Sequence, residues 1–413
     1  MNKHILVVSQ VFYPEQFRIN DICTEWTKRG YKVTAITGIP NYPQGKFYEG
    51  YGIFRKRREN YNGVEIIRIP IIPRGNNPVQ LALNYFSFVF SGFFWHLFTR
   101  IKADYVFIFE TSPMTQALVG VWYAQRRKIP CYIYVQDLWP ENVEIVAGIK
   151  NKLILGAIGK MVDYIYARCE KIFATSMSFV RSIEKRGVPS EKIEYLPQYA
   201  EDYYMPVPRN FVEDIPIDGS FNIIFTGNIG NAQGLEVLPK TAKILKEKGY
   251  GKKIRFNIVG DGRSKKNLVD EVQKHYVSDM FNFIPKKPPW EIPALLSASD
   301  AAFLSFMDTP LFAMTIPAKL QSYMACGIPI IAAAYGESRQ IVEEAGAGLC
   351  CPPGKADELA EIIIEMFKMD RDCLREMGEN ARRYYNQHFN KQKLLERLDQ
   401  FFNTMEEEAY VRE

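Results

Sequence analysis

Short apolar runs alternate regularly with amphipathic stretches along this chain, and the alternation restarts once near its middle. The apolar runs of the first half lie at residues 4–9, 32–37, 64–70, 104–109, 131–135 and 171–175. Those of the second half begin at Phe221 and continue at 254–259, 301–304 and 328–332. Strand–helix–strand alternation predicts a parallel sheet with helices on both faces. Two such series predict an α/β protein of two doubly wound domains that face each other across a cleft.

The breaks in this pattern suggest the domain boundaries. Residues 201–219 hold prolines and scattered acids with little periodicity, which is typical of an interdomain linker. The first domain is therefore expected over residues 1–200 and the second over 220–385, a division that suits a chain of 413 residues. The charged stretch 386–413 predicts a helix that packs back on the first domain.

Two segments of the second half, the glycine-rich loop 227–234 and the stretch that begins at Thr315, lead into a helix start and are candidate anion sites. Proline is predicted to lie in the first turn of the second of these helices. The candidate ligand-binding residues of the two segments are Gly227, Asn228, Gly230, Pro317 and Lys319. Free backbone N–H groups and the positive end of a helix can hold a phosphate at each place. Arg263 follows another strand, and ligands of open parallel sheets bind beyond the carboxyl ends of the strands. A diphosphate-bearing ligand would use both places; the alternative is that the glycines only form turns.

Composition and motifs argue against several functions. A net charge of +5, from 52 basic and 47 acidic residues, is too small for a nucleic-acid-binding protein. The first strand–helix turn, Ser9–Gln16, contains no glycine, so it lacks the fingerprint of dinucleotide-dependent enzymes, nucleotide-sugar epimerases among them. The four histidines are far apart in sequence, and Asp370 and Asp372 lie in a charged helical stretch, so no metal site is predicted.

The cysteines and the N-terminus bear on the compartment. Seven cysteines lack a paired metal spacing, which indicates free thiols in a reducing compartment. The few residues before the first apolar run are too short for a signal peptide. We therefore expect a cytoplasmic protein without a cofactor or metal. A periplasmic sugar-binding protein, which needs an export signal, is disfavoured.

Five strings of residues carry a resemblance to a known family. In chain order they are Tyr13–Asp21, Thr37–Lys46, Gln136–Glu141, Gly227–Gly234 and Ile316–Leu320. With them the chain resembles bacterial glycosyltransferases of the large retaining family 4, specifically the WbuB-like branch that builds capsule and O-antigen repeats. The resemblance spans nearly the whole chain and implies a GT-B fold of two Rossmann-like domains. It also implies a nucleotide-sugar donor, here a UDP-N-acetylhexosamine, on the C-terminal domain, an acceptor on the N-terminal domain and no catalytic metal.

The chain departs from the wider family where the donor is expected. Two glutamates eight residues apart, which many members use for the donor sugar and ribose, are matched by Met314 and Ser322. Asn228 and Gln233 stand near the places of an Arg and a Lys that grip the diphosphate. Gln136 replaces the histidine of a His–Asp pair, so no histidine role is carried over.

Preorganised cations that face the departing diphosphate should carry much of the rate of glycosyl transfer. Arg263 and Lys319 are predicted for that role, with a turn arginine and a surface lysine as the alternatives. Asp137, after a buried strand, is predicted to contact or deprotonate the acceptor hydroxyl, and its alternative is a turn carboxylate. Glu337, which also follows a strand, is predicted to touch the donor sugar or ribose.

Three further residues are candidates for acceptor binding. Arg18 and Asn20 lie in the first loop, whose place favours contact with the acceptor or a phosphate. Glu141 has two alternatives: an acid in the cleft, or a buried partner near Trp139.

No Asp, Glu, Lys or Arg occurs from Gly75 to Thr99. Within this stretch residues 76–78 predict a turn, and residues 79–99 predict one long helix. Residues 79–99 would measure about 31 Å, enough to cross a bilayer core. The polar side chains form one narrow stripe of Gln80, Asn84, Ser87 and Ser91. The remaining arc is apolar and includes Phe90 and Phe94. A spanning helix would separate the two halves of the first sheet, so two alternatives remain: an apolar arc in lipid, or a wholly buried helix.

The basic run Arg55, Lys56, Arg57 and Arg58 favours the first alternative. At roughly 1 kcal/mol per basic residue near anionic lipid, the run contributes about 4 kcal/mol; otherwise it is a solvated loop. The predicted protein is a peripheral enzyme on the inner face of the cell membrane. It would move a sugar to a polyprenyl-diphosphate-linked saccharide in surface polysaccharide assembly. A family member that binds donor without transferring it is the alternative, because the two glutamates are absent.

Overall fold

The computed structural model describes residues 3–75 and 77–412, and beyond Phe402 it describes the backbone alone. Residues 1, 2 and 76 of the predicted first domain and residue 413 of the predicted C-terminal helix lie outside the described residues. The chain divides into two compact units. Unit 1 runs to Leu196 and resumes at Arg397, and unit 2 is Pro197–Glu396.

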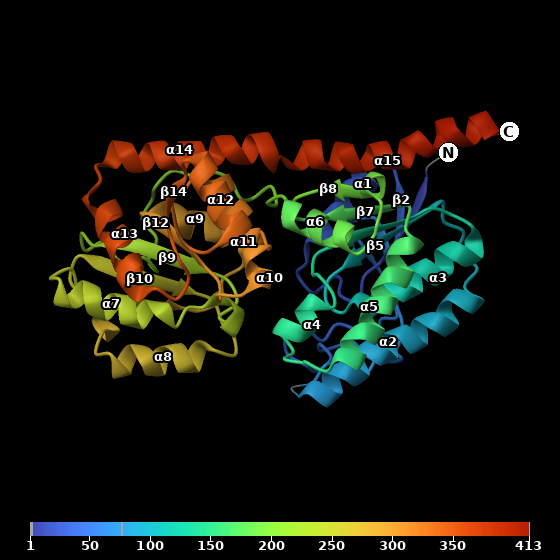
Figure 1. Cartoon of the computed structure of the whole chain (residues 1–413), viewed down its shortest axis with the longest axis horizontal. Helices are drawn as coiled ribbons and strands as arrows, with labels where there is room; N and C mark the ends of the chain where they lie inside the picture. The colour runs from blue at the N-terminus through green and yellow to red at the C-terminus, as the bar shows by residue number, and fades with distance from the viewer. Residues whose placement is uncertain (1–2, 76, 413) are drawn as a thin grey trace. The chain divides into compact units, whose positions relative to one another are not determined.

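Unit 1 is built around an eight-stranded sheet of order β3-β4-β2-β1-β5-β6-β7-β8 (Figure 1). Its strands are β1 (His4–Val8), β2 (Lys32–Thr37), β3 (Arg58–Tyr61), β4 (Val64–Arg68), β5 (Tyr105–Glu110), β6 (Cys131–Val135), β7 (Lys171–Ala174) and β8 (Ile193–Tyr195). Neighbouring strands are parallel except β3 with β4. The central strands β1, β5 and β6 are buried along their whole length, as continuous apolar runs in a parallel sheet predict.

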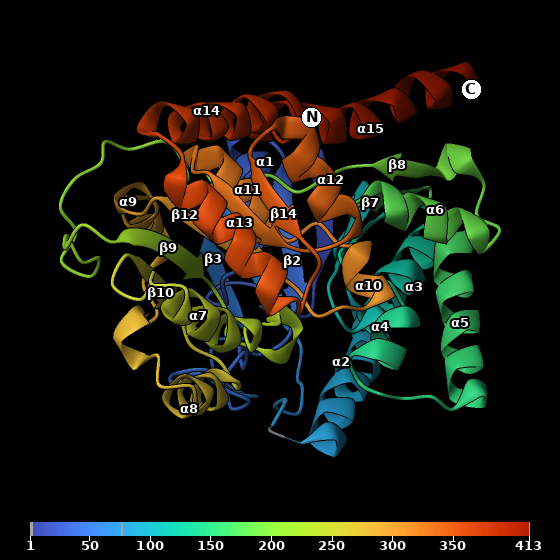
Figure 2. The ribbon, with the colours of Figure 1, turned by 60° about the vertical axis from the view of Figure 1, so that its left-hand side comes forward.

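Helices cover both faces of this sheet (Figures 1 and 2). They are α1 (Arg18–Lys28), α2 (Pro78–Phe98), α3 (Ala117–Arg127), α4 (Glu141–Ile145), α5 (Lys152–Ala167) and α6 (Met177–Lys185), with the 3₁₀ turns η1 (Met114–Gln116) and η2 (Ser190–Lys192). Helix α3 contacts both α2 and α5, so these three helices share a face. On the other face, Phe402 of α15 (Lys391–Arg412) packs its ring against Trp26 and Tyr105. The end of the chain therefore packs on unit 1.

Unit 2 holds a six-stranded parallel sheet of order β11-β10-β9-β12-β13-β14. Its strands are β9 (Phe221–Thr226), β10 (Ile254–Val259), β11 (Phe281–Ile284), β12 (Ala301–Ser305), β13 (Ile330–Ala333) and β14 (Gly348–Cys351). Its helices and 3₁₀ turns are η3 (Asn231–Gln233), α7 (Val237–Glu247), α8 (Lys265–Lys274), η4 (Ser278–Met280), η5 (Pro289–Glu291), α9 (Ile292–Ala298), α10 (Pro310–Ala313), α11 (Ala318–Cys326), α12 (Gly336–Ala345), α13 (Ala356–Lys368) and α14 (Arg371–His388). Neighbours on β9 face opposite sides: Phe225 lies in the core with α7 and α13, and Ile224 in the core with α9 and α11.

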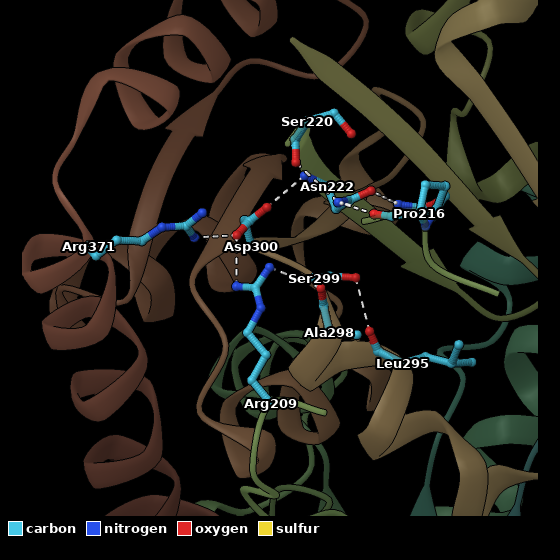
Figure 3. A network of polar contacts seen from close by, with 10 residues as sticks. Arg209, Pro216, Ser220, Asn222, Leu295, Ala298, Ser299, Asp300 and Arg371 are labelled. Atoms are coloured by element: carbon cyan, nitrogen blue, oxygen red, sulfur yellow. Dashed lines mark hydrogen bonds and ion pairs between the residues drawn. The ribbon is translucent and has the colours of Figure 1, made fainter. Parts of the chain in front are cut away.

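The segment predicted as an interdomain linker, 201–219, packs on unit 2 instead. Its Arg209 pairs with the fully buried side chain of Asp300 at 2.9 Å (Figure 3). Asp300 also pairs with Arg371 of α14 and accepts a hydrogen bond from the Asn222 N–H at 2.8 Å. An unpaired buried carboxylate costs several kcal/mol. The network therefore holds both the segment and α14 against the sheet.

The boundaries near the C-terminus also differ from the prediction. Helix α14 runs through residue 386, where the C-terminal helix was predicted to begin, and α15 begins at Lys391. The chain returns to unit 1 at Arg397. Unit 2 likewise begins at Pro197 rather than at residue 220, because contacts distant in sequence fix the segment that precedes β9.

Candidate active site

The carboxyl end of the unit 2 sheet is formed by loops that pack backbone against backbone. The Ile229 N–H, after β9, donates to the Asp261 carbonyl, after β10, at 2.8 Å. Gly260 has a φ of +142°, and a Cβ there would lie 2.0 Å from the Gly227 carbonyl oxygen. Glycine is therefore required at position 260, both for its backbone angle and for the close approach of the two loops.

The sequence predicts that the glycine-rich loop leads straight into a helix, and the structure differs. Gly230 precedes the 3₁₀ turn η3, and helix α7 begins only at Val237. Asn228 and Arg263, in the neighbouring loops, are both exposed. In the part of the chain that the structure describes, the Arg263 side chain has no hydrogen bond or ion pair. Its guanidinium is thus free to meet a ligand.

Helix α11 supplies the strongest candidate cation. Pro317 is its N-cap and not a first-turn residue as predicted, and Lys319 lies in the first turn. The Lys319 ammonium donates to Gln233 Oε1 in the glycine-rich loop and lies 4.2 Å from the ring centroid of Phe225. Desolvation lowers the pKa of Lys319 to about 7. An anion bound beside it would favour the charged form again.

The family's two carboxylate positions hold other groups here. Met314 follows α10, and the Ser322 hydroxyl donates to the Ala318 carbonyl of its own helix at 3.1 Å. Glu337 is buried in the first turn of α12, just after β13, where the positive helix end stabilises its charge. It is a carboxylate at the carboxyl end of this sheet, the place where the sequence predicts contact with the donor.

In unit 1, Asp137 follows β6 and meets the loop after β5. Its Oδ2 accepts a hydrogen bond from the Ser112 N–H at 2.7 Å. Burial raises the pKa of Asp137, and the bonds from Ser112 lower it in part. Burial also raises the pKa of Tyr85 on α2, with Arg74 lowering it and Asp137 raising it further. Asp137 thus fixes the turn at Ser112 and also lies near enough to Tyr85 for its charge to act on that side chain.

A second carboxyl group, which sequence reasoning missed, lies beside Asp137. Glu110 ends β5 fully buried, and its Oε1 has no hydrogen-bond partner among the described residues. Burial, and next the Asp137 charge, raise the pKa of Glu110 well above its usual range. The two carboxyl groups therefore lie close together, where burial and their mutual repulsion disfavour two negative charges. The available signal was a glutamate at the end of the apolar run Tyr105–Glu110.

Glu15 was also missed, because it lies in a loop whose fold the sequence does not reveal. Its Oε1 accepts hydrogen bonds from the Asn41 and Tyr42 N–H groups at 2.8 and 2.6 Å. It therefore joins the loop after β1 to the loop after β2. Burial raises the pKa of Glu15 to about 7, although these bonds lower it in part.

Two predicted acceptor residues lie in a helix and not in the first loop. Arg18 begins α1, and Asn20 follows in its first turn. The amide of Asn20 is used locally: it accepts from the Tyr13 N–H at 3.2 Å and donates to the Glu15 carbonyl at 2.7 Å. Glu141 begins α4 half-buried, and its Oε2 has no hydrogen-bond partner among the described residues. Asn20 therefore shapes the loop, whereas Glu141 keeps an oxygen for a ligand.

Helix α2 is polar toward the protein and apolar toward its outer face. Asn84 accepts from Gln10 Nε2 at 2.7 Å, and Ser91 donates to the Pro70 carbonyl at 2.5 Å. Its exposed apolar side chains are Val79, Leu83, Phe86, Phe90, Phe93, Phe94, Leu97 and Phe98. By length and composition alone α2 could cross a membrane. However, it joins two strands of one sheet, β4 and β5, and its polar stripe is bonded to that unit.

The basic run lies at the carboxyl end of β4. Arg58 begins β3 opposite Ile67, and Arg57 donates to the backbone carbonyls of Ile53 and Arg68. The other members of the run, Arg55, Lys56 and Arg58, are exposed. Three cations therefore face solvent, whereas Arg57 holds the turn in place.

Family models for two glycosyltransferase domains match this chain. The glycosyl transferase 4-like domain matches residues 16–198, and the glycosyl transferases group 1 domain matches residues 209–384. The putative colanic acid biosynthesis glycosyl transferase WcaI of Escherichia coli K12 is 26% identical over 92% of this chain and 93% of that relative. The probable glycosyltransferase WbjE of Pseudomonas aeruginosa is 27% identical, over 59% of this chain and 61% of that relative.

Solved structures share the fold of both units. Sucrose-phosphate synthase from Thermosynechococcus elongatus matches with a TM-score of 0.76 and 16% identity, over 98% of this chain and 99% of that one. HepE of Anabaena, solved in complex with UDP, matches with a TM-score of 0.69 and 16% identity, over 98% and 100%. With its two parallel-sheet α/β units, this chain has the GT-B fold of glycosyltransferases. Together its two matched domains cover most of its length, and the chain belongs to the family 4 glycosyltransferases.

Proposed function

We propose that this protein moves an N-acetylhexosamine from a UDP-sugar to a polyprenyl-diphosphate-linked saccharide during surface polysaccharide assembly. The transfer retains the anomeric configuration and uses no metal ion. The name of the relative WcaI refers to colanic acid biosynthesis, and HepE was solved with UDP. The observation that carries the proposal is Lys319, a poorly solvated cation beside the glycine-rich loop. The only hydrogen bond of its ammonium group among the described residues goes to the amide of Gln233.

The donor end supplies positive charge for the leaving group. Negative charge grows on the diphosphate as the sugar departs, and groups held in place before the reaction stabilise it most effectively. Lys319 at the first turn of α11 and the exposed Arg263 are the cations proposed for this work. Gly227, Asn228 and Gly230 let the backbone approach the donor, and Glu337 contacts its sugar or ribose.

The acceptor end supplies groups for the incoming hydroxyl. Asp137 accepts one hydrogen bond from a backbone N–H and has its pKa raised by burial, which suits a carboxylate that holds or takes a hydroxyl proton. Burial raises the pKa of Glu110 behind it, which favours the neutral form and limits the negative charge of the site. Glu141 and Arg18 are proposed to bind the acceptor.

Helix α2 and the basic run support the proposed binding at the cytoplasmic face of the membrane. A large apolar side chain taken out of water contributes about 1.5–3 kcal/mol, and α2 exposes several of them, including Phe90 and Phe94. Arg55, Lys56 and Arg58 each add about 1 kcal/mol near anionic lipid. In flotation with anionic vesicles, neutralising residues 55–58 should reduce binding.

The donor is tested first, by thermal shift of the purified protein against UDP-, GDP- and dTDP-sugars. UDP-N-acetylhexosamines should raise the melting temperature most, and EDTA should not abolish this effect. Release of UDP is then measured with and without a polyprenyl-diphosphate-linked saccharide. Acceptor-dependent release supports the transferase. A shift with GDP-sugars alone, or a strict need for a divalent ion, would contradict the proposal.

A family member that only binds donor is the second candidate, because Met314 and Ser322 replace the usual glutamates. It predicts a thermal shift with donor and no release of UDP with any lipid-linked acceptor. The matched domains do not support a nucleotide-sugar epimerase, because both are glycosyltransferase domains.

A further inference from the structure

A second apolar element of unit 1, besides α2, is exposed between α4 and the first turns of α5. We call residues 146–154 the α5 tip. Its exposed apolar members are Val146, Ile149, Leu153 and Ile154. Leu153 is 85% exposed although it lies in a helix. Single exposed leucines are common, but four large apolar side chains within nine residues form a patch that calls for a partner.

The α5 tip is a well-formed structure and not a frayed end. Asn151 caps α5 by accepting hydrogen bonds from the Leu153 and Ile154 N–H groups at 2.9 and 3.3 Å. Farther along the helix, Val162 and Ile165 are buried against unit 1. The cap and the buried turns therefore fix the direction in which Leu153 and Ile154 are presented.

The topology puts the α5 tip at the same end of the sheet as the candidate acceptor residues. Helix α5 connects the parallel strands β6 and β7, so its N-terminus lies at their carboxyl end, where Asp137 and Glu141 also lie. Helix α2 likewise leaves the carboxyl end of β4. Figures 1 and 2 both show the N-terminal ends of α2 and α5 on the same side of unit 1.

A third apolar point lies at this end of the sheet. In the turn before the basic run, Phe54 is 94% exposed and Ile53 is also exposed. The antiparallel pairing of Arg58 with Ile67 places this turn at the carboxyl end of β4. Three elements that are separate in sequence therefore expose apolar side chains at one end of one sheet.

We propose that the α5 tip inserts into the membrane as a second anchor, and that with α2 and the Phe54 turn it holds the carboxyl end of the unit 1 sheet against an anionic bilayer. This proposal rests on the proposed lipid-linked acceptor. A diphosphate at headgroup level then reaches Asp137 and Glu141 without leaving the membrane. The α5 tip orients the enzyme, whereas α2 provides most of the attachment.

Charge favours a lipid surface over a protein partner. Lys150 and Lys152 are exposed within the α5 tip, and the exposed Arg55 and Lys56 directly follow Phe54. Basic residues next to inserted apolar side chains are the pattern of proteins that bind anionic membranes. A second copy of this chain would bring the same positive charges together and would be repelled.

The test is co-flotation of the full chain with vesicles of phosphatidylglycerol and phosphatidylethanolamine. The variant Leu153→Gln/Ile154→Gln should bind about tenfold more weakly or worse. The matched control Phe211→Gln/Ile217→Gln removes two exposed apolar side chains from unit 2 and should bind like the wild type. Equal binding by the tip variant and the control would overturn the proposal. Self-association that the tip variant abolishes, seen by gel filtration without vesicles, would overturn it as well.

Insertion is measured directly with a tryptophan at the tip. Fluorescence of Leu153→Trp should be quenched by brominated phospholipids more than that of the wild type, whereas Lys160→Trp, exposed about two turns farther along α5, should show no extra quenching. Equal quenching at the two positions would contradict insertion of the α5 tip.

Two further variants separate this proposal from the proposed function. Phe86→Gln/Phe90→Gln on α2 should lose vesicle binding. If it does while the tip variant still binds, the tip proposal fails and the membrane enzyme stands. The tip variant should also keep its rate with a short-chain, water-soluble acceptor and lose at least tenfold with an acceptor embedded in vesicles. Equal loss with both acceptors would show a catalytic or folding defect and overturn the anchor.

Discussion

In unit 2, desolvation lowers the pKa of Lys319, whereas in unit 1 desolvation raises the pKa of Glu15, Glu110 and Asp137. Burial disfavours the charged form of each group, so the same effect acts with opposite sign on a cation and on acids. The unit 2 sheet thus ends in a site that gains from an incoming anion. The unit 1 sheet ends in carboxyl groups whose charged forms are disfavoured by burial. Each end matches the ligand proposed for it: a diphosphate in unit 2 and a hydroxyl in unit 1.

Replacing the cation should have the largest effect. Lys319→Met should lower kcat by about 100- to 1000-fold, because it removes a preorganised charge that faces the leaving group. Lys319→Arg should keep part of the rate. The control Lys243→Met, on an exposed lysine of α7, should be unaffected. Steady-state UDP release checks this, and a loss of less than tenfold would remove Lys319 from the mechanism.

Asp300 of unit 2 is a buried carboxylate with two arginine partners, whereas Glu110 of unit 1 is buried beside another carboxyl group. Arg209→Gln/Arg371→Gln leaves the fully buried side chain of Asp300 without its ion pairs and should cost about 3 kcal/mol of unfolding free energy in urea. Each single change should cost less than half as much, since one partner remains. Arg375→Gln, an exposed neighbour on α14, is the control. An additive, small loss would mean that Asp300 tolerates burial as Glu110 does.

Asp137→Asn tests the acid end. Acceptor-dependent transfer should fall about 100-fold, because the amide cannot take the hydroxyl proton. Binding of UDP, measured by calorimetry, should not change. Glu144→Gln, an exposed carboxylate on α4, is the matched control. Weaker UDP binding by Asp137→Asn would mean that the acids do not serve the acceptor alone.

The pH dependence of UDP binding tests the cation end. Lys319 has a pKa of about 7 in the empty site, below its ordinary value of 10.5. Above pH 7 it must therefore take up a proton to pair with a diphosphate, and the Kd of UDP should rise by up to about tenfold per pH unit. Calorimetry at pH 6–9, in buffers of different ionisation enthalpy, measures both the Kd and the proton uptake. Lys319→Arg should remove this dependence. A flat wild-type profile would contradict the lowered pKa of Lys319, and with it the contrast between the two units.

Glu110→Gln should have the smallest effect. The raised pKa of Glu110 indicates a protonated carboxyl group, so a neutral amide of similar shape should change the unfolding free energy by less than about 1 kcal/mol. Urea unfolding at pH 7 checks this. A loss of several kcal/mol would show that Glu110 is charged and paired in the folded protein.

The fold was largely predictable from sequence, because a buried parallel strand needs a continuous apolar run and the runs are plain to see. The loops at the carboxyl end of the unit 2 sheet were predictable for the same reason, since they follow strands. The role of 201–219 was not predictable, because Arg209 meets Asp300 ninety-one residues later and local composition cannot report that contact. Glu15 and Glu110 were missed because burial of a carboxyl group depends on tertiary packing. The polar stripe of α2 was found, but periodicity does not say which face of a helix turns inward.

The inverted polarity of α2 has a practical consequence for every copy of the chain that is not on a membrane. Its exposed phenylalanines then contact water, which is unfavourable, or another copy of the chain, which leads to aggregation. Purified samples should therefore need mild detergent or lipid nanodiscs to stay dispersed. Under the proposed membrane binding, rapid attachment to a bilayer would decide how much of the newly made protein avoids aggregation.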